Sequence, residues 1–333
     1  MAAGKFQSVT IEGFKSIRAL TVELRPINIL IGANGSGKSN FLEAFRFMEE
    51  AHSYPPDAYL AKAGGANRIL HYGAKVTDTI IVQIDSLSRN WRIKYHLMQE
   101  DRLAGSRSDT GIVGANLPSF RVYRMHDTSA ASPLKRTAAI DDNRLLRSEG
   151  ENLASFLYLL KQSYPDALLR IEDCIRQIAP FFGSFLLEPL KLNPNTIKLE
   201  WNHSAFDSYC DASMLSDGTL RFIALATLLL QPVELRPDII LIDEPELGLH
   251  PRAIGLLASL IKQASVDTQV VVATQSPLLV DYFEPEDILV ADRINGATEI
   301  RRLQAEPLRD WLKEYSLGEL WEKGELEGTP RKE

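Results

Sequence analysis

Apolar and polar residues alternate at the start of the chain and then give way to a continuous apolar run. Val9 and Ile11 alternate with polar neighbours, and residues 21–24 repeat the pattern. Residues 27–31 are mostly apolar, which is typical of a strand buried on both faces. After a glycine-rich turn, residues 39–50 place apolar side chains at helical spacing. The pattern therefore predicts the order strand, glycine loop, helix.

The pattern changes several times further along the chain. Residues 79–85 and 91–97 each alternate, which predicts an antiparallel hairpin. Segments 100–116 and 127–136 are rich in small and polar residues, which predicts loops. The remaining elements are predicted as helices at 152–160, 166–178, 218–230 and 253–264, and strands at 185–190, 196–201, 238–242 and 269–273. This alternation predicts a parallel sheet in an α/β layer, and the charged tail from Gly324 predicts a frayed end.

Composition favours a folded protein in a reducing compartment. The chain has 333 residues, and 45% of them are hydrophobic, which is enough to form a core. No apolar run reaches the roughly 18 residues of a membrane span, and residues 1–10 do not have the pattern of a secretory signal. Cys174 and Cys210 are too few for a zinc cluster or a disulfide framework. We expect two buried thiols, a cytoplasmic location and no membrane partner.

The acidic charge balance bears on nucleic-acid binding. The net charge is −7 and the pI is about 5.5, so no overall positive field attracts nucleic acid. A local basic patch remains an alternative. Because no aromatic array accompanies the basic residues, solvated loop charges are the favoured interpretation. The candidate basic residues are Arg121, Arg124, Lys135, Arg136, Arg144 and Arg147.

Residues 32–39 form a phosphate-binding motif in the predicted context. Gly-Ala-Asn-Gly-Ser-Gly-Lys-Ser fits G-x-x-x-x-G-K-[ST] between a strand and a helix. The glycines let backbone N–H groups surround phosphates, Lys38 contacts the β- and γ-phosphates, and Ser39 binds Mg²⁺. The candidate nucleotide-binding residues here are Asn34, Gly35, Ser36, Gly37, Lys38, Ser39 and Asn40. A chance glycine-rich turn is the alternative.

A second chemical pattern stands at the end of an apolar strand. Residues 239–242 are apolar and lead into Asp243 and Glu244. In this arrangement Asp243 holds the Mg²⁺ shell and Glu244 polarises the attacking water. A solvated strand end is the alternative, and the phosphate loop upstream makes it less favoured.

A third segment gives these two motifs a family context. Leu215-Ser216-Asp217-Gly218-Thr219 opens a predicted helix upstream of the acidic strand. This order resembles ABC ATPases, whose signature motif is most commonly Leu-Ser-Gly-Gly-Gln. Asp217 and Thr219 depart from that form, whereas Ser216 and Gly218 match it. The resemblance implies that Ser216 and Gly218 meet the γ-phosphate held by an opposing subunit. A serine helix cap followed by glycine is the alternative reading.

Within the ABC ATPases, the chain resembles the branch of the RecF, SMC and OLD proteins, especially short bacterial ATPases. The resemblance rests on residues 11–17, 28–40, 243–251 and 273–277. It implies an α/β fold, namely a P-loop NTPase head with a mixed or parallel central sheet, an antiparallel β subdomain and a helical signature lobe. It implies one head over 1–333, with an N-terminal β and phosphate-loop lobe at 1–130, a signature lobe at 131–230, an acidic-strand and switch part at 231–305, and C-terminal helices and tail at 306–333.

The chain departs from the family pattern at the switch position. Gln275 stands where family members often have His, and it cannot donate a charged hydrogen bond to the γ-phosphate. Slow turnover is therefore expected. Residues 245–250 are expected to face the other subunit. The glutamine that couples the lobe to Mg²⁺ is left open between several candidates, including Gln83 and Gln99.

Two hypotheses for the function follow. In the first, ATP and Mg²⁺ join two copies head to tail, hydrolysis at Glu244 separates them, and the cycle drives or gates a separate effector or nucleic acid in DNA maintenance or phage defence. In the second, the chain is a nucleotide-gated binding subunit with negligible turnover. Gln275 at the switch position is the residue that suggests this hypothesis. The long coiled-coil arm of SMC proteins is absent, because no sustained heptad pattern separates Ser39 from Ser216. A membrane-transporter ATPase is a more distant alternative.

Overall fold

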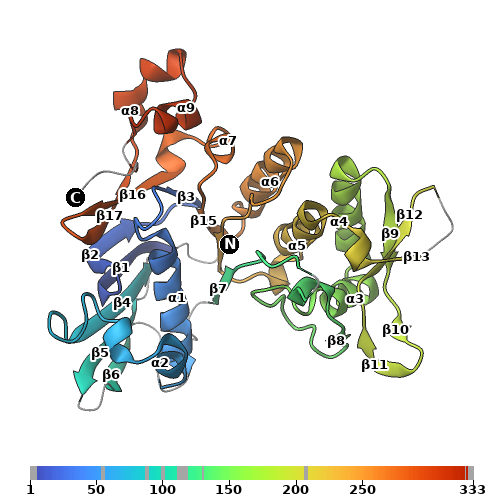
Figure 1. Ribbon diagram of the computed structural model, residues 1–333, viewed down its shortest axis with the longest axis horizontal. Helices are drawn as coiled ribbons and strands as arrows, with labels where there is room; N and C mark the ends of the chain where they lie inside the picture. The colour runs from blue at the N-terminus through green and yellow to red at the C-terminus, as the bar shows by residue number, and fades with distance from the viewer. Residues whose placement is uncertain are drawn as a thin grey trace. The chain divides into compact units, whose positions relative to one another are not determined.

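The computed structural model describes residues 6–53, 57–86, 90–98, 102–110, 119–129, 131–205, 209–326 and 328. The chain divides into two compact units, each made of separate stretches of sequence. Unit 1 contains residues 1–122, 238–243 and 269–333, and unit 2 contains residues 123–237 and 244–268. Each unit is described by itself below (Figure 1). The lobe boundaries given above stay a prediction.

Unit 1 begins with an antiparallel sheet in the order β2-β1-β4-β5-β6. Its strands are β1 (Phe6–Phe14), β2 (Ile17–Glu23), β4 (Thr79–Ser86), β5 (Asn90–Met98) and β6 (Arg102–Thr110). The predicted hairpin of β4 and β5 is confirmed, with Val82 opposite Ile93. The predicted loop at 100–116 is wrong where the structure describes it. Residues 102–110 pair with β5 along their whole length, because backbone hydrogen bonds do not need an apolar sequence.

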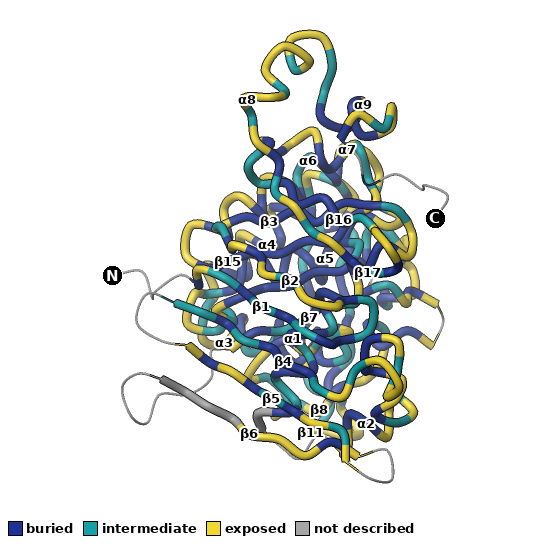
Figure 2. Tube along the Cα trace, turned by 90° about the vertical axis from the view of Figure 1, so that its left-hand side faces the viewer, coloured by how far each residue is buried: buried dark blue, intermediate teal, exposed yellow. Residues whose placement is uncertain are grey.

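A six-stranded mixed sheet carries the predicted parallel core of unit 1. Its order is β17-β16-β3-β15-β14-β7. The strands are β3 (Ile27–Ile31), β7 (Phe120–Tyr123), β14 (Ile239–Asp243), β15 (Gln269–Ala273), β16 (Ile288–Ile294) and β17 (Ala297–Arg302). β16, β3, β15 and β14 run parallel, whereas β17 is antiparallel to β16. Every residue of β3 and β15 is buried, as their apolar runs predict (Figure 2).

One helix joins the two sheets of unit 1 into a single core. α1 (Lys38–Ser53) contacts β1, β4 and β5 of the antiparallel sheet and β14 and β15 of the mixed sheet. Phe41, Phe45 and Phe47 on this helix are fully buried. The other helices of the unit are α2 (Asp57–Ala63), α7 (Pro277–Val280), α8 (Ala305–Leu308) and α9 (Leu317–Glu322). Short 3₁₀ turns lie at Ala66–Arg68, Pro285–Asp287 and Trp311–Lys313.

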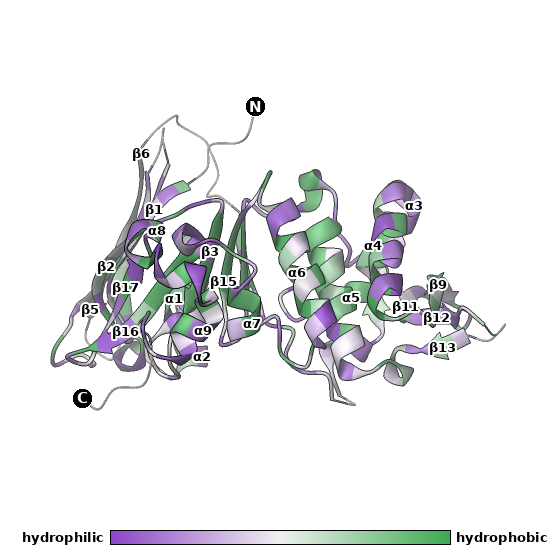
Figure 3. Cartoon of the chain, turned by 90° about the horizontal axis from the view of Figure 1, so that it is seen from above, coloured by the Kyte–Doolittle hydropathy of each residue, from purple (hydrophilic) through white to green (hydrophobic). Residues whose placement is uncertain are grey.

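Unit 2 is built around a mostly apolar helix that is buried on all sides. α5 (Asp217–Leu230) is buried from Leu220 to Leu230, and its apolar colour is evident in Figure 3. α5 contacts α4 and α6, and α4 contacts α3. The other helices are α3 (Leu153–Ser163), α4 (Pro165–Ile178) and α6 (Pro251–Ala264), with 3₁₀ turns at Pro133–Lys135, Ala212–Met214 and Val233–Leu235. The four helices predicted here are confirmed.

Two small sheets complete unit 2, in the orders β10-β11-β8 and β13-β12-β9. Their strands are β8 (Ala138–Ala139), β9 (Phe182–Leu186), β10 (Pro189–Leu190), β11 (Asn193–Ile197), β12 (Glu200–His203) and β13 (Tyr209–Asp211). The predicted strands 185–190 and 196–201 are wrong in their bounds. Each is divided between two strands of different sheets, so the chain changes sheet inside each apolar run.

The structure also tests the predictions for the two cysteines and for the C-terminal tail. Cys174 and Cys210 are buried free thiols, as expected. The predicted fraying from Gly324 is wrong for residues 324–326 and 328: Leu326 is 1% exposed, and its carbonyl accepts a hydrogen bond from Arg301. The remaining tail lies outside the described residues. Within the described ranges, no helix is long and apolar enough to cross a membrane.

Candidate nucleotide-binding site

The phosphate-binding motif forms the turn between β3 and α1, as predicted. Lys38 begins the 16-residue helix α1, so the loop lies at a helix N-terminus, where backbone N–H groups and the helix dipole favour an anion. The side chain of Lys38 is 6% exposed, and its ammonium donates to the carbonyls of Gly32 (2.6 Å) and Ala33 (3.0 Å). Asn34, Gly35 and Ser39 are exposed. The loop therefore holds its lysine inside and presents its outer residues to a ligand.

A chain of hydrogen bonds supports this loop from behind. Asn40 Nδ2 donates to Ser16 Oγ (2.7 Å), the Ser16 and Thr298 hydroxyls are 2.7 Å apart, and Thr298 Oγ1 donates to the Ser36 carbonyl (2.8 Å). Gly37 has φ +106°, and a Cβ on it would lie 2.0 Å from Thr298 Oγ1. Only glycine fits there. The sequence motif did not reveal Ser16 or Thr298 as part of the site, because both are remote from the loop in sequence.

The loop also contains a buried polar atom that suits an oxyanion ligand. Ser36 is 4% exposed, and its hydroxyl has no hydrogen-bond partner among the described residues. A buried hydroxyl without a partner costs free energy and calls for an explanation. Together with Lys38 and the helix N-terminus, this hydroxyl makes the loop chemically suited to the phosphates of a nucleotide.

The acidic strand end and the switch residue lie at the same edge of the mixed sheet as the phosphate loop. Asp243 pairs with Ala273, and Ala273 pairs with Leu30, in parallel register. The backbone N–H of Thr274 donates to the Leu30 carbonyl (3.0 Å). The carboxyl ends of β3, β15 and β14 therefore meet, with Asp243 two strands from the loop, roughly 10 Å across the sheet. Gln275 follows β15 and is exposed, whereas Asp243 is 7% exposed.

Part of this edge is hollowed. A cavity of about 280 Å³ is lined by Gly32, Ala33 and Asn34 of the loop and by Gln275. The structure thus brings two predicted site residues, Asn34 and Gln275, to one cavity.

Glu244, the predicted catalytic carboxylate, has an unusual backbone. It follows β14 directly and is half-buried, with φ +45°. A non-glycine residue in the left-handed region costs on the order of 1–3 kcal/mol, and such residues cluster at functional sites. The turn continues with hydrogen bonds from Leu247 N to Glu244 O (3.4 Å) and from Leu249 N to Glu246 O (3.0 Å). Asp243 is thus the last residue of a regular strand, and Glu244 is the first residue of a strained turn.

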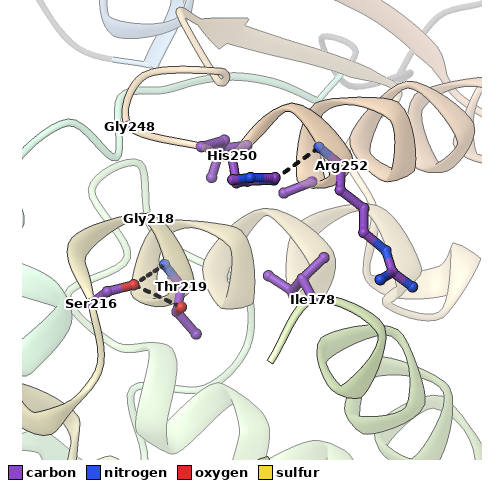
Figure 4. Close-up of a pocket in the computed structure, with 9 residues that line it drawn as sticks. Ile178, Ser216, Gly218, Thr219, Gly248, His250 and Arg252 are labelled. Atoms are coloured by element: carbon purple, nitrogen blue, oxygen red, sulfur yellow. Dashed lines mark hydrogen bonds between the residues drawn. The ribbon is translucent and has the colours of Figure 1, made fainter. Parts of the chain in front are cut away.

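The signature segment opens α5 in unit 2, as predicted. Ser216 caps the helix: its hydroxyl accepts from the Thr219 N–H (3.2 Å) and lies 2.8 Å from the Thr219 hydroxyl (Figure 4). Ser216, Gly218 and Thr219 line a cavity of about 150 Å³ with His250 and Arg252. Figure 4 shows that these last two residues come from the start of α6, where His250 Nδ1 accepts from the Arg252 N–H (3.3 Å).

Close packing fixes α5 against the segment that follows Glu244. A Cβ on Gly218 would lie 2.3 Å from the Gly248 carbonyl oxygen, so the helix approaches Gly248 through a glycine. Arg221, one turn further along, donates to the carbonyls of Met125 (2.9 Å) and His126 (2.6 Å). Burial lowers the pKa of Arg221, and the nearby carboxylates of Asp217 and Glu246 oppose that effect. The sequence motif alone did not identify Arg221.

The candidate basic patch is largely engaged within the chain. Arg121 pairs with Glu49 (3.8 Å), Lys135 with Asp217 (3.8 Å) and Arg147 with Asp142 (2.7 Å). Of the several candidate coupling glutamines, Gln83 donates to Asp85 within β4 (2.7 Å), and Gln99 lies outside the described residues. Within the part of the chain that the structure describes, no group of three His, Cys, Asp or Glu side chains could hold a metal ion. A Mg²⁺ bound through one or two protein oxygens and nucleotide phosphates does not require such a group.

Comparisons with known proteins agree with this geometry. A family model described as "AAA domain, putative AbiEii toxin, Type IV TA system" matches residues 100–281, and one described as "AAA ATPase domain" matches residues 5–163. A search among curated proteins gave no match.

The similar solved structures are heads of SMC proteins. An SMC head bound to the C-terminal winged-helix domain of ScpA is 16% identical (TM-score 0.65; 92% of this chain and 99% of that one covered). The SMC head domain from Thermotoga maritima is 16% identical (TM-score 0.52; 90% and 99% covered). An SMC head with an extended coiled coil, bound to the C-terminal domain of ScpA and described as derived from Pyrococcus furiosus, is 15% identical (TM-score 0.62; 94% and 99% covered).

The family models and the fold together define an AAA-type ATPase with a P-loop NTPase head similar to SMC heads, and this head includes an antiparallel sheet. More narrowly, the chain belongs to the AAA-domain family whose model covers residues 100–281. The roles of the individual site residues stay predictions.

Proposed function

We propose that this protein binds and hydrolyses ATP at the edge of the mixed sheet. The observation that carries the proposal is that the phosphate loop, Asp243 and Gln275 meet at the carboxyl ends of neighbouring parallel strands. Loop amides and Lys38 hold the phosphates, and Ser39 and Asp243 hold Mg²⁺. Glu244 polarises the attacking water. Bound by these residues, Mg²⁺ would supply positive charge that offsets the charge developing on the phosphates.

The second half of each site comes from another copy of the chain. The start of α5 offers a backbone N–H and a hydroxyl beside Arg252 in a small cavity, and such a group of donors suits a γ-phosphate. ATP bound to the phosphate loop of one copy would thus be sandwiched by Ser216 and Gly218 of another. Two identical sites form in one head-to-tail dimer.

Gln275 favours a slow cycle of ATP hydrolysis, and it is also the reason for considering a second function. A neutral amide at the switch position lends less stabilisation to a developing phosphate charge than a cationic imidazole. In the alternative, ATP closes the dimer without measurable turnover, and the chain acts as a nucleotide-gated binding subunit.

The cycle drives or gates a partner in DNA maintenance or phage defence. The matched family's description names a toxin of a type IV toxin–antitoxin system, and two of the similar SMC heads were solved with ScpA bound. The ScpA complexes favour a separate effector for this head. Nucleic acid is a less favoured partner, because three of the six candidate basic side chains are paired with carboxylates.

Steady-state phosphate release separates hydrolysis from gated binding. We expect the wild-type protein to release phosphate in Mg-ATP, and Glu244→Gln to bind ATP without releasing it. Lys38→Ala controls for contaminating ATPases, because it removes binding. If the wild type binds ATP but releases phosphate no faster than Glu244→Gln, the gated-subunit function replaces the ATPase function.

A further inference from the structure

The cavity beside the phosphate loop has a wall that no motif predicts. Besides the loop and Gln275, its lining includes Pro277 at the start of α7 and Trp321 and Glu322 of α9. Trp321 is 8% exposed, whereas Glu322 is exposed. An aromatic ring and a carboxylate from α9 therefore stand beside the residues expected to meet the terminal phosphate.

α9 is fixed to the sheet that carries the phosphate loop. The Gly328 N–H donates to Asp292 Oδ1 on β16 (2.8 Å), and the Gly328 carbonyl accepts from Trp321 Nε1 (3.5 Å). A Cβ on Gly328 would lie 3.3 Å from the Cα of Gly32, so this backbone packs directly on the first glycine of the loop. Motion of the loop would therefore change the environment of the Trp321 side chain.

α9 is also fixed to the segment that follows the switch residue. α9 packs against α7, and α7 begins two residues after Gln275. The Gly318 N–H donates to Asp281 Oδ1 at the end of α7 (2.6 Å). Within α9, Ser316 and Glu319 form a reciprocal capping box that holds the short helix in place. The helix thus bridges the two loops that flank the cavity.

We propose that α9 is a third wall of the nucleotide site, beside the phosphate loop and the switch segment at Gln275. It lies at the end of the site that receives the γ-phosphate of a nucleoside triphosphate. This inference rests on the proposed ATP binding. Trp321 is a positioning residue that links the phosphate loop to the switch segment. Glu322 places a negative charge near the γ-phosphate, so it weakens binding of the triphosphate more than binding of the diphosphate. The repulsion is modest because Glu322 is exposed and screened by salt.

Tryptophan fluorescence tests the wall and isothermal calorimetry tests the charge, with Mg-AMP-PNP and Mg-ADP as probes. AMP-PNP should change the fluorescence of the wild type and of Trp311→Phe, which alters an exposed tryptophan, but not that of Trp321→Phe. Glu322→Gln should bind AMP-PNP about two- to threefold more tightly at low salt and bind ADP unchanged. Glu306→Gln, at an exposed carboxylate on α8, is the matched control.

The outcomes separate this inference from the proposed function. If AMP-PNP binds the wild type, but the fluorescence change survives Trp321→Phe and Glu322→Gln binds both probes like the wild type, α9 is not part of the site and the proposed function stands. If calorimetry detects no binding of either probe to the wild type, the proposed function fails and the third wall fails with it.

Discussion

The phosphate loop and the signature segment both lie at helix N-termini, yet they differ in how complete they are. Behind the loop, the Ser16–Thr298 hydroxyl pair and Asn40 form a relay that ends on the Ser36 carbonyl, and Lys38 is buried within the loop. At the signature segment, Ser216 is exposed, and its hydroxyl is engaged with Thr219 of its own helix.

The phosphate loop has the features of a complete phosphate-binding site, whereas the signature segment fits the proposed half site that a second copy completes. A preorganised loop can bind phosphates within one chain, because its donors are already held in place. An exposed cap in a small cavity gains a phosphate only when another molecule brings one. Variants of the loop should therefore change ATP affinity in the monomer, whereas variants of the signature segment should change assembly and stability but leave that affinity unchanged.

The largest expected effect is the loss of ATP binding in Lys38→Ala. The change removes the buried ammonium that is expected to contact the phosphates, and we expect affinity for Mg-ATP to fall by about 100-fold or more, the equivalent of roughly 3 kcal/mol. Calorimetry on the monomer measures it, with Lys313→Ala at an exposed ion pair as the control. Ser216→Ala should keep wild-type affinity. Equal losses in Ser216→Ala and Lys38→Ala would erase the distinction between the two regions.

Gly218→Ala should have the next largest effect, and it should act on stability and assembly. The new methyl group would lie 2.3 Å from the Gly248 carbonyl, so backbone must shift. Strain of this kind costs about 1–3 kcal/mol, measurable by urea unfolding. Ser216→Ala is the companion variant and should cost about 1 kcal/mol through loss of the helix cap. Gly218→Ala with wild-type stability would show that the approach of α5 to Gly248 is not tight.

A smaller effect is expected for Thr298→Val. The change removes the hydroxyl that bonds the Ser36 carbonyl, which should cost about 1–2 kcal/mol of stability. If half of this loss of stability acts on the loop, affinity for Mg-ATP falls by about two- to fivefold. Thr10→Val, which breaks an exposed pairing with Thr21, is the matched control. Unchanged affinity in Thr298→Val would mean that the relay does not preorganise the loop.

A separate prediction concerns a thiol outside both regions. Burial raises the pKa of Cys174 to about 11, and the thiolate is the reactive form. In a Cys210→Ser background, a thiol reagent at about pH 8 should modify the native protein at least 100-fold more slowly than the urea-unfolded protein. The native rate should rise as the pH approaches 11. Fast native labelling would show that α4 opens readily.

Sequence reasoning succeeded where the structure depends on neighbours in the chain. The strand, glycine loop and helix around Lys38, the helix start at Ser216 and the strand that ends at Asp243 are all local patterns. Their agreement with the structure follows from helix and strand periodicity and from capping.

Sequence-based prediction failed where segments that are distant in the chain lie side by side in the fold. β6 forms in a polar stretch because β5 supplies its backbone partners. Thr298 reaches the phosphate loop through the pairing of β17 with β16, and α9 reaches it through β16 and α7, which no local pattern shows. The charged tail was predicted to fray because its anchoring contacts, such as Leu326 with Arg301, are remote in sequence.

Sedimentation velocity of Glu244→Gln, with and without Mg-ATP, tests most directly whether the signature segment is a half site completed by a second copy. We expect a monomer without nucleotide and a dimer with Mg-ATP, and we expect that adding Ser216→Arg abolishes the dimer while ATP binding persists. A protein that binds ATP yet sediments as a monomer under both conditions would contradict the head-to-tail dimer.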